Sequence, residues 1–489
     1  MARGKKVAKE LTLEEKLQQA LLPVEEQPYE IPENWCWTNV ESINSYSGTS
    51  IDPLEDPDTL FELYSVPSSA NDYPEIIYGT DIKSAKKAVK KNDVLLCKIN
   101  PRINRVWKVS QHTDNKLLAS SEWIVIRNII INPDYLMYCF RTQYFRKYML
   151  SNVSGVGGSL MRAKPKYIKK YPVPIPPLTE QQRIVNCIES IFVKLDEAKE
   201  KAYAVVDGYE LRKAAILHKA FTGKLTAKWR EDHPSLKNTI LKDVETYSSV
   251  WKTKDKRFLA EEQSKAEIVR LENGHEWIKC TIGAISRVTN GSTPSRKEPD
   301  YWNGNIPWIS SGEVRNNIIE ISNECITEEG FNNSSVKLLP AGTVLIAMIG
   351  EGKTRGQSAI LNIEATINQN IAAIVVDHGC VLPHYIWYWF QMNYAKNREK
   401  GAGSGPQALN CQRVRELDFF VPNLDEQTEI ITLLQKILDR EQKVREIAES
   451  VIEKIDSMKK VVLARAFRGE LGTNNPDEEN ALELLKEML

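Results

Sequence analysis

Apolar residues recur at alternating spacings of four and three in two long stretches of the chain. The first stretch contains Ile184, Ile188, Ile191, Leu195, Ala198, Ala202, Val205 and Tyr209, and the second contains Ile430, Leu434, Ile437, Val444, Ala448, Val451, Ile455, Met458 and Val462. This heptad pattern, which has one polar break at Glu441, predicts two coiled-coil helices. Thr179 and Asp425 stand where N-caps are expected, and Gly223 and Gly469 where the helices should end. Each helix would span about 40 residues, or roughly 60 Å.

Between these stretches the pattern changes to short apolar runs separated by loops rich in Gly, Ser, Asn and Pro. Residues 94–99, 343–349, 123–126 and 372–376 read as buried strands. Aromatic-rich residues 135–148 and 385–394 read as helices. We therefore expect a mixed α/β (α+β) fold with two globular domains, separated by two long antiparallel coiled-coil helices of equal length.

The two halves of the chain repeat each other. Pro176, Leu178, Glu180 and Gln181 recur 246 residues later as Pro422, Leu424, Glu426 and Gln427, and this offset holds without a gap from position 155 to position 225. Within the globular stretches the offset varies between 242 and 250. The repeat predicts a pseudo-two-fold molecule whose helices have a fixed length and whose domains vary.

The segments between the copies match in length. Residues 224–276 form a linker of 53 residues, and the tail 470–489 together with the head 1–34 has 54. The chain is therefore expected to be circularly organised, with its ends meeting in space. Leu482, Leu484 and Leu485 would pack with Leu13, Leu17 and Leu21 and so rebuild the helices expected at 236–244 and 258–271.

These patterns divide the chain into seven parts. They are an N-terminal helical arm (1–30), a first globular domain (31–177), a first long helix (178–222), a central linker with short helices (223–274), a second globular domain (275–423), a second long helix (424–469) and a C-terminal tail helix (470–489).

Composition excludes several classes of protein. The 65 basic and 65 acidic residues cancel, so no overall field favours a nucleic acid or a membrane. The eight cysteines lack a C-x-x-C pair, which predicts reduced core thiols and no metal site. No apolar run is long enough to cross a membrane, so we expect a cytoplasmic protein without a membrane partner.

Local charge nevertheless favours DNA. Residues 81–108 hold nine Lys or Arg against two acids, and residues 141–170 hold eight against none. Recognition of DNA bases would also need Asn, Gln, Arg or Lys side chains on loops of both copies, because these side chains bond the edges of G and A. The candidate DNA-binding residues are Lys98, Asn100, Arg102, Asn104, Arg105, Arg162, Lys164, Arg296, Arg315, Asn316, Lys353, Thr354, Arg355 and Gln357.

One segment suggests an enzyme instead. Residues 347–354 follow an apolar strand and fit a relaxed phosphate loop, in which Lys353 would contact phosphate and Thr354 would contact Mg. The pattern starts with Ala347 instead of glycine, is followed by no helix-forming run, and is replaced by Asn100-Pro-Arg-Ile-Asn104 in the first copy. A polar hairpin turn suits both copies. A nucleotide-using enzyme and a coiled-coil scaffold without DNA binding stay open as alternatives.

Four motifs resemble one known family. Pro174-Ile-Pro-Pro-Leu-Thr-Glu-Gln181, Val421-Pro-Asn-Leu-Asp-Glu-Gln427, the run at 220–230 and Ile306-Pro-Trp-Ile-Ser-Ser-Gly312 are similar to the specificity subunit of type I restriction-modification enzymes, and the resemblance covers essentially the whole chain.

The resemblance implies a non-catalytic subunit whose two target recognition domains each read one half of a bipartite DNA target. It implies that the conserved helices set the spacing and dock two copies of a methyltransferase subunit, which restriction/translocase subunits then join. S-adenosylmethionine, ATP and Mg would belong to these partner subunits, and this chain would bind no cofactor of its own.

Overall fold

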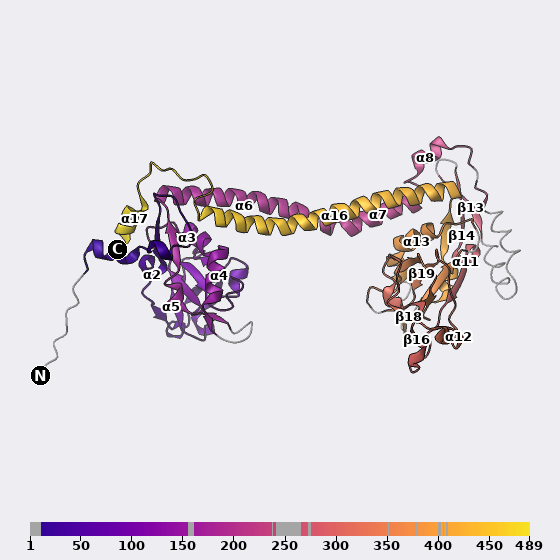
Figure 1. Cartoon of the computed structure of the whole chain (residues 1–489), viewed down its shortest axis with the longest axis horizontal. Coiled ribbons are helices and arrows are strands. Elements are labelled where there is room, and N and C mark those ends of the chain that lie inside the picture. The colour runs from indigo at the N-terminus through magenta and orange to yellow at the C-terminus, as the bar shows by residue number, and fades with distance from the viewer. Residues whose placement is uncertain are drawn as a thin grey trace. The chain divides into compact units, whose positions relative to one another are not determined.

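The structure is a computed structural model of the 489-residue chain. It describes residues 11–154, 161–236, 238–240, 266–271, 275–350, 352–376, 379–399, 402–403, 405–406 and 409–489. Contacts divide the chain into two compact units, Met1–Tyr203 with Glu449–Leu489, and Ala204–Ala448 (Figure 1). The first unit therefore contains both ends of the chain, and the second unit is one continuous segment.

The strands of the first unit form four small sheets. Two are pairs, β1 with β12 and β10 with β11; one has the order β7-β6-β9 and one the order β2-β5-β8-β3-β4. The bounds are β1 (Cys36–Asn39), β2 (Ser50–Ile51), β3 (Leu60–Tyr64), β4 (Glu75–Tyr78), β5 (Lys86–Ala88), β6 (Val94–Cys97), β7 (Val106–Lys108), β8 (Lys116–Ala119), β9 (Trp123–Ile126), β10 (Val153–Ser154), β11 (Arg162–Ala163) and β12 (Pro172–Ile175).

Short helices surround these sheets, and one long helix leaves them. The last residues of α6 belong to the second unit. The helices are α1 (Leu13–Ala20), α2 (Val40–Ile43), α3 (Pro133–Phe140), α4 (Gln143–Ser151), α5 (Pro165–Ile168), α6 (Leu178–Asp207) and α17 (Ala481–Met488), with 3-10 turns η1 (Val24–Glu26), η2 (Pro53–Glu55), η3 (Ser68–Ala70) and η4 (Gly79–Asp81).

The second unit repeats the plan with larger sheets. Their orders are β15-β22-β19-β20-β17, β13-β14-β25, β18-β16-β21 and β23-β24. The strands are β13 (Glu267–Arg270), β14 (Glu276–Thr281), β15 (Arg287–Asn290), β16 (Trp302–Ile309), β17 (Asn317–Ile319), β18 (Glu324–Ile326), β19 (Val344–Ala347), β20 (Ser358–Leu361), β21 (Thr366–Ile367), β22 (Ile371–Val375), β23 (Ala402–Gly403), β24 (Gly405–Pro406) and β25 (Asp418–Val421).

Helix α16 is shared by the two units, because Leu424–Ala448 lies in the second and Glu449–Ala466 in the first. The helices of the second unit are α7 (Tyr209–Phe221), α8 (Ala227–Asp232), α11 (Ile282–Ile285), α12 (Glu328–Asn332), α13 (Pro383–Met392), α14 (Tyr394–Glu399), α15 (Cys411–Arg415) and α16 (Leu424–Ala466), with 3-10 turns η5 (Pro299–Tyr301) and η6 (Ser311–Glu313).

The central strand of each unit is buried on both faces, which explains its uninterrupted apolar run. In β6, Val94 and Leu96 belong to one core cluster while Leu95 and Cys97 belong to another. β19 divides in the same way, with alternate residues in two clusters. Alternate side chains of a strand point to opposite faces, so both clusters need apolar residues. The predictions of strands at 94–99, 123–126, 343–349 and 372–376 are confirmed, each within two residues at either end.

Each unit contains an antiparallel helix pair. In the first unit Lys199 of α6 donates to Asp456 of α16 at 2.6 Å, and Lys459 donates to Asp196. The partner of the later residue on α6 is therefore the earlier residue on α16, which means that the two helices run antiparallel. In the second unit Arg212 of α7 donates to Glu441 at 2.7 Å, so the polar break in the predicted seam is an ion pair.

Several expectations about the helices need correction. The first helix is interrupted at Gly208 instead of running without a break. Ala198 is exposed, and Val444 and Met458 are 40% and 51% exposed, so these three residues do not belong to the seam. Both helices begin before the predicted caps, and the side chain of Asn423 caps α16 by accepting from the Glu426 amide at 2.8 Å. The ends are as predicted, because Gly223 and Gly469 adopt φ values of 74° and 73°.

The expected helix at 258–271 is wrong in its described end. Glu267–Arg270 forms β13, which pairs along the edge of β14, and Lys279 bonds Glu267 at 3.1 Å. Residues 241–257 and the start of that segment lie outside the described residues.

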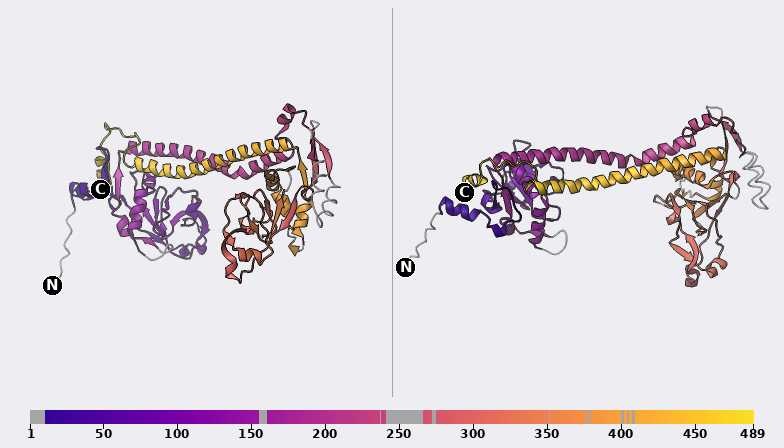
Figure 2. Two further views of the ribbon diagram at one scale, coloured as in Figure 1. Left: turned by 45° about the vertical axis from the view of Figure 1, so that its right-hand side comes forward. Right: turned by 45° about the horizontal axis from the view of Figure 1, so that its top comes forward.

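The predicted meeting of head and tail is confirmed. α17 lies beside α1 in both views of Figure 2. Leu17, Leu21, Leu482, Leu484 and Leu485 join one core cluster, whereas Leu13 is exposed. The Ala481 amide donates to the Asn34 carbonyl at 2.9 Å. None of the helices in the described ranges is long and apolar enough to cross a membrane.

Candidate nucleic-acid interface

A polar turn joins the central strand of each unit to an antiparallel neighbour. β6 and β7 flank the turn at 98–105 in the first unit, and β19 and β20 flank the turn at 348–357 in the second. Asn100 and Asn104 have φ values of 45° and 50°, a region that Asn tolerates better than most residues. Ten of the predicted DNA-binding residues lie in these two turns or on the segments bonded to them.

The second of these turns is no phosphate loop. A phosphate loop ends in a helix whose N-terminal amides bind the phosphate. Here β19 and β20 form a hairpin, and no helix begins at any described residue between them. Lys353 is exposed, and its carbonyl accepts from the Tyr394 hydroxyl at 2.6 Å. The nucleotide-enzyme alternative is therefore wrong in its geometry, and the hairpin prediction is confirmed. The sequence also places Asp377 at the end of an apolar strand, where a second Mg-binding residue would stand, but Asp377 lies outside the described residues.

In the first unit the turn continues as a short ladder with residues 161–163. The Asn100 amide donates to the Met161 carbonyl at 2.9 Å, and the Ala163 amide donates to the Lys98 carbonyl at 2.8 Å. Lys98 and Arg162 both lie within 4 Å of Glu122. The structure therefore brings Lys98, Asn100 and Arg162 together, and Glu122 neutralises part of their charge.

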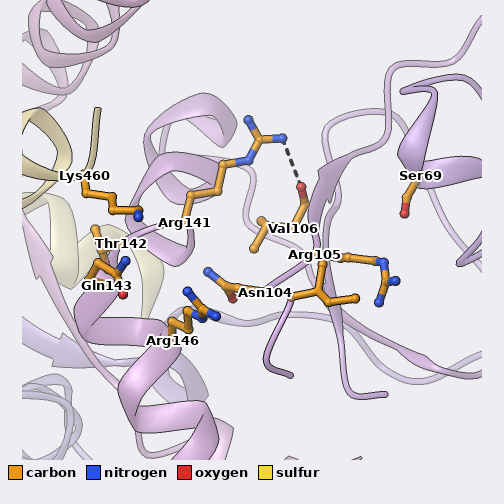
Figure 3. Close-up of a pocket in the computed structure, with 10 residues that line it drawn as sticks. Ser69, Asn104, Arg105, Val106, Arg141, Thr142, Gln143, Arg146 and Lys460 are labelled. Atoms are coloured by element: carbon orange, nitrogen blue, oxygen red, sulfur yellow. Dashed lines mark hydrogen bonds between the residues drawn. The ribbon is translucent and has the colours of Figure 1, made fainter. Parts of the chain in front are cut away.

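The remaining candidates of the first unit lie around this ladder. Arg102 is exposed at the tip of the turn. Lys164 lies just before α5, with its amine 5.9 Å from the centre of the Tyr167 ring. Asn104 and Arg105 line a separate cavity (Figure 3).

Arg296 stands apart in the second unit, where an aromatic pair and a carboxylate hold it. Its guanidinium lies 3.6 Å from the centre of the Trp302 ring and 5.0 Å from that of Trp308. It donates to both oxygens of Glu324, at 2.6 and 2.8 Å, and these bonds lower the pKa of Glu324. Because Glu324 engages its hydrogen-bonding edge and Trp302 covers one face of the guanidinium, Arg296 could offer a ligand only the opposite cationic face.

Asn316 and Gln357 support the hairpin itself, and Arg315 lies beside Asn316 in the chain. Asn316, at φ 57°, accepts from the Ser358 amide at 3.0 Å and so fixes the start of β20. Arg315 donates from Nε to the Gly312 carbonyl at 2.6 Å and is otherwise exposed. The backbone groups of Gln357 bond Thr354 and Ala347 inside the turn.

Arg355 links this turn to α14. Its Nη2 donates to the Arg398 carbonyl at 3.3 Å, while its buried Nε has no hydrogen-bond partner. Arg398 in turn donates to the Tyr394 hydroxyl at 2.8 Å. Lys353, Thr354, Arg355 and Gln357 are thus brought together in one turn, against a helix that also carries Lys396.

The Pro-x-Leu-x-Glu-Gln motif has a structural role that the sequence did not reveal. Glu180 and Glu426 are buried at the start of α6 and α16, and each accepts from a tryptophan indole, of Trp35 at 2.7 Å and of Trp277 at 3.1 Å. These tryptophans precede or begin the strands β1 and β14. The glutamate therefore fastens the first strand of each globular part to its long helix.

The neighbouring glutamine fastens a second element. Gln181 donates to the Pro176 carbonyl at 3.0 Å and accepts from the Asn132 amide at 2.9 Å, just before α3. Gln427 donates to the Pro422 carbonyl and accepts from the Leu382 amide at 2.8 Å, just before α13. Because both glutamine side chains are buried, losing one of their partners would leave a buried polar group unpaired. The motif therefore sets the position of each globular part on its helix.

Sequence reasoning missed three residues beside Asn104 and Arg105. Arg141 and Arg146 belong to the basic stretch at 141–170, but their residue type alone does not distinguish them from the other cations of that stretch. Lys460 lies on α16, more than 300 positions further along the chain, and no sequence signal connects it with the first turn. Among the described residues no group of three His, Cys, Asp or Glu side chains is placed to hold a metal ion.

The fold and the junctions define a protein of two similar modules, each an α+β part fastened to its own helix pair. The chain matches the family model of the type I restriction modification DNA specificity domain twice, over residues 54–204 and 274–450. These matches cover more than half of the chain, so the chain belongs to this family. The resemblance seen in the sequence motifs is confirmed.

Known relatives and a solved structure agree. The chain is 31% identical over 165 residues to the specificity subunit of the type I restriction enzyme EcoR124I/EcoR124II from Escherichia coli, covering 33% of this chain and 40% of that protein. It is 22% identical over 425 residues to the HindI specificity subunit from Haemophilus influenzae, covering 79% and 88%. The alignment thus spans less than half the length of the first relative and most of the second.

The fold is shared with the crystal structure of the HsdS subunit from Thermoanaerobacter tengcongensis. The TM-score is 0.64 at 18% sequence identity, and the match covers 92% of this chain and 100% of that one. The expected fold class is confirmed by this likeness.

Proposed function

We propose that this chain is the non-catalytic subunit that gives a type I restriction-modification complex its DNA specificity. Each globular part reads one half of a bipartite target in double-stranded DNA. The observation that carries the proposal is the duplication of one arrangement, in which a cationic hairpin turn lies on a domain that the Glu-Gln motif fastens to a long helix. The two globular parts have different loops, so they would bind two different half-sites, as an asymmetric target requires.

The candidate contacts divide by chemistry. Exposed Arg102, Lys353 and Arg315 suit phosphates or guanine edges, while Arg296 offers a stacking face. Asn316, whose side chain supports the hairpin, is a poorer candidate for reading a base. The proposal therefore rests on the turns, and within them on the exposed cations.

The paired helices set the gap between the half-sites. Their register is specified by reciprocal ion pairs in the first unit and by Arg212 with Glu441 in the second. A helix pair whose register is specified in this way resists sliding, as a spacer must.

The same helices dock two copies of the methyltransferase subunit, which restriction/translocase subunits then join. Exposed apolar side chains favour a protein partner on these helices, since isolated surface helices usually expose polar residues there. Leu211 and Ile447 are 77% and 64% exposed, and Val193 and Val461 are also exposed. S-adenosylmethionine, ATP and Mg would be bound by these partner subunits and not by this chain.

Mapping of methylated adenines in DNA treated with the assembled complex tests this function. We expect one bipartite, asymmetric sequence with a constant gap. Exchange of the globular part at 275–423 for that of another family member should change one half of the target only. Methylation without any sequence preference, or a complex without salt-dependent DNA affinity, would instead support a scaffold that does not read DNA.

A further inference from the structure

A cationic cavity of about 310 Å³ opens in the first unit between the hairpin turn, the α3–α4 corner and helix α16. Arg105, Arg141, Arg146 and Lys460 line it together with Asn104 and Thr142 (Figure 3). No Asp or Glu is among its lining residues. The guanidinium of Arg105 points away from the other three cations (Figure 3), and Asp72 and Asp134 act on Arg141 from outside the lining. Arg141, Arg146 and Lys460 still place three positive charges around one small space, and an anion there would reduce their mutual repulsion.

Some of the donors in this cavity have no partner in the protein. The Nε of Arg146 is buried without a hydrogen bond. Arg141 uses one nitrogen, Nη2, on the Val106 carbonyl at 3.0 Å and keeps other N–H groups. Asn104 donates to the Phe140 carbonyl at 3.0 Å, and its unpaired oxygen Oδ1 is an acceptor that cannot bond a phosphodiester.

Lys460 completes the cavity from outside the globular part. It lies on α16, and its amine points toward Arg141 and Thr142 (Figure 3). Among the described residues no carboxylate is within ion-pair distance of it, and Asp456, one turn earlier, is bonded by Lys199. Its charge is therefore available to a ligand in the cavity.

We propose that this cavity binds a phosphate of the DNA backbone. Guanidinium and ammonium groups are the usual ligands of phosphate oxygens, and a recess without carboxylates suits an anion better than a base edge. The inference rests on the proposed DNA-reading function and adds a positioning contact to it. Since Lys460 comes from the helix and the arginines from the domain, one phosphate would tie both to the DNA.

The contact is expected in one half of the molecule only. At the repeat offset of 246, Lys460 corresponds to Ala214, which has no charge. A phosphate held by domain and helix together would therefore mark the half-site read by the first domain.

The test uses the full chain assembled with its methyltransferase subunits, and the variants Lys460→Ala, Lys460→Arg and Lys454→Ala. Lys454 is an exposed lysine on the same helix outside the cavity and serves as the matched control. We expect Lys460→Ala to weaken DNA binding roughly tenfold for target and non-target DNA alike, and to lower the salt slope by about one. Lys460→Arg should restore both, and Lys454→Ala should change neither.

A scan of the target with single neutral methylphosphonate linkages locates the phosphate. One position in the first half-site should cost the wild-type complex roughly tenfold in affinity and should cost the Lys460→Ala complex clearly less, because only the arginine contacts remain to be lost there. If every position weakens both complexes equally, or if Lys460→Ala behaves as Lys454→Ala does, the inference is overturned.

Two further outcomes identify other ligands. Stabilisation of the wild-type chain by inorganic phosphate that Lys460→Ala abolishes, without any change in DNA affinity, would assign the cavity to a free oxyanion. Loss of subunit assembly with unchanged DNA affinity would assign it to a protein carboxylate. Either result overturns the DNA contact, whereas a wild-type complex that reads no sequence would refute the proposed function itself.

Discussion

The indole Nε1 of Trp277 and the carboxylate of Glu426 lie 3.1 Å apart in a buried junction that repeats in the other unit as Trp35 and Glu180. The two junctions differ in their other partners. Glu426 also accepts from Arg230 and Thr226, at 2.5 and 2.8 Å. Glu180 accepts from Thr473 and Asn474, at 3.3 and 2.9 Å. One junction is thus a buried ion pair, and the other is a set of neutral donors.

This difference predicts unequal effects of the same substitution. Glu426→Gln leaves the buried Arg230 without its counter-charge and should destabilise the second unit by about 3–5 kcal/mol. Glu180→Gln removes only charge-assisted bonds from neutral donors and should cost about 1–3 kcal/mol. Hydrogen exchange of amides in each unit measures both losses separately. Equal losses would mean that the ion pair adds nothing to the junction.

Arg183 and Glu478 predict a dependence of the tail on pH. Arg183 at the start of α6 donates to both oxygens of Glu478, at 2.7 Å each, which lowers the pKa of Glu478 from its ordinary value of 4.5. A lowered folded-state pKa means that the pair stabilises the packed tail above pH 4.5, and that this is lost as the pH falls through the folded-state value. Proteolysis of the tail should therefore accelerate in mild acid below pH 4.5.

Glu478→Gln provides the control for this effect. It should expose the tail to proteolysis already at neutral pH and remove most of the acid dependence. Glu479→Gln alters a neighbouring carboxylate for which the structure shows no ion pair among the described residues, and should leave both unchanged.

The hairpin turn of the second unit predicts the behaviour of Lys353→Ala. An exposed lysine at the tip of a turn contributes to phosphate binding through charge alone. We expect several-fold weaker DNA binding, a salt slope lower by about one, and no dependence on added nucleotide. Fluorescence anisotropy at several salt concentrations measures this, with exposed Lys337→Ala as the control. An unchanged salt dependence of the DNA affinity would show that Lys353 does not contact a phosphate.

The helix pairs predict a change in the target gap. Insertion of seven residues after position 203 and seven after position 448 lengthens both helices by about 10 Å and keeps the seam in phase. The gap in the methylated target should grow by about three base pairs, because each base pair rises about 3.4 Å. Insertion into one helix alone breaks the register of Arg212 with Glu441 and should abolish assembly or specificity. Methylome mapping decides, and an unchanged gap with intact methylation would refute the spacing role.

Periodic features of this chain could be predicted from the sequence because they depend on neighbouring residues. The heptad spacing predicted the helices, and the continuous apolar runs predicted strands β6 and β19, which are buried on both faces. The repeat and the matching linker lengths predicted that head and tail pack together. The capping residue Asn423 was missed because Asp425, two positions later, suits a cap equally well by residue type.

The candidate site was only partly predictable. Charge identified the turns, but it could not show that Asn316 supports β20 or that Glu324 and two tryptophans hold Arg296. These roles depend on which segments the sheets bring into contact. The segment Glu267–Arg270 was likewise not predictable, because it has a helical pattern but forms a strand by pairing with the edge of β14.

The sequence by itself determined that this protein is a duplicated pair of modules with helices of fixed length, because periodicity and repetition are local and countable. Only the tertiary structure decided what the Glu-Gln motif does and that Lys460 lines one cavity with Arg141 and Arg146. The segments joined in this way lie from 45 to more than 300 residues apart in the chain, so no local pattern brings them together. The junction bonds are strong because the glutamate and glutamine side chains are buried, and burial is a property of the tertiary structure.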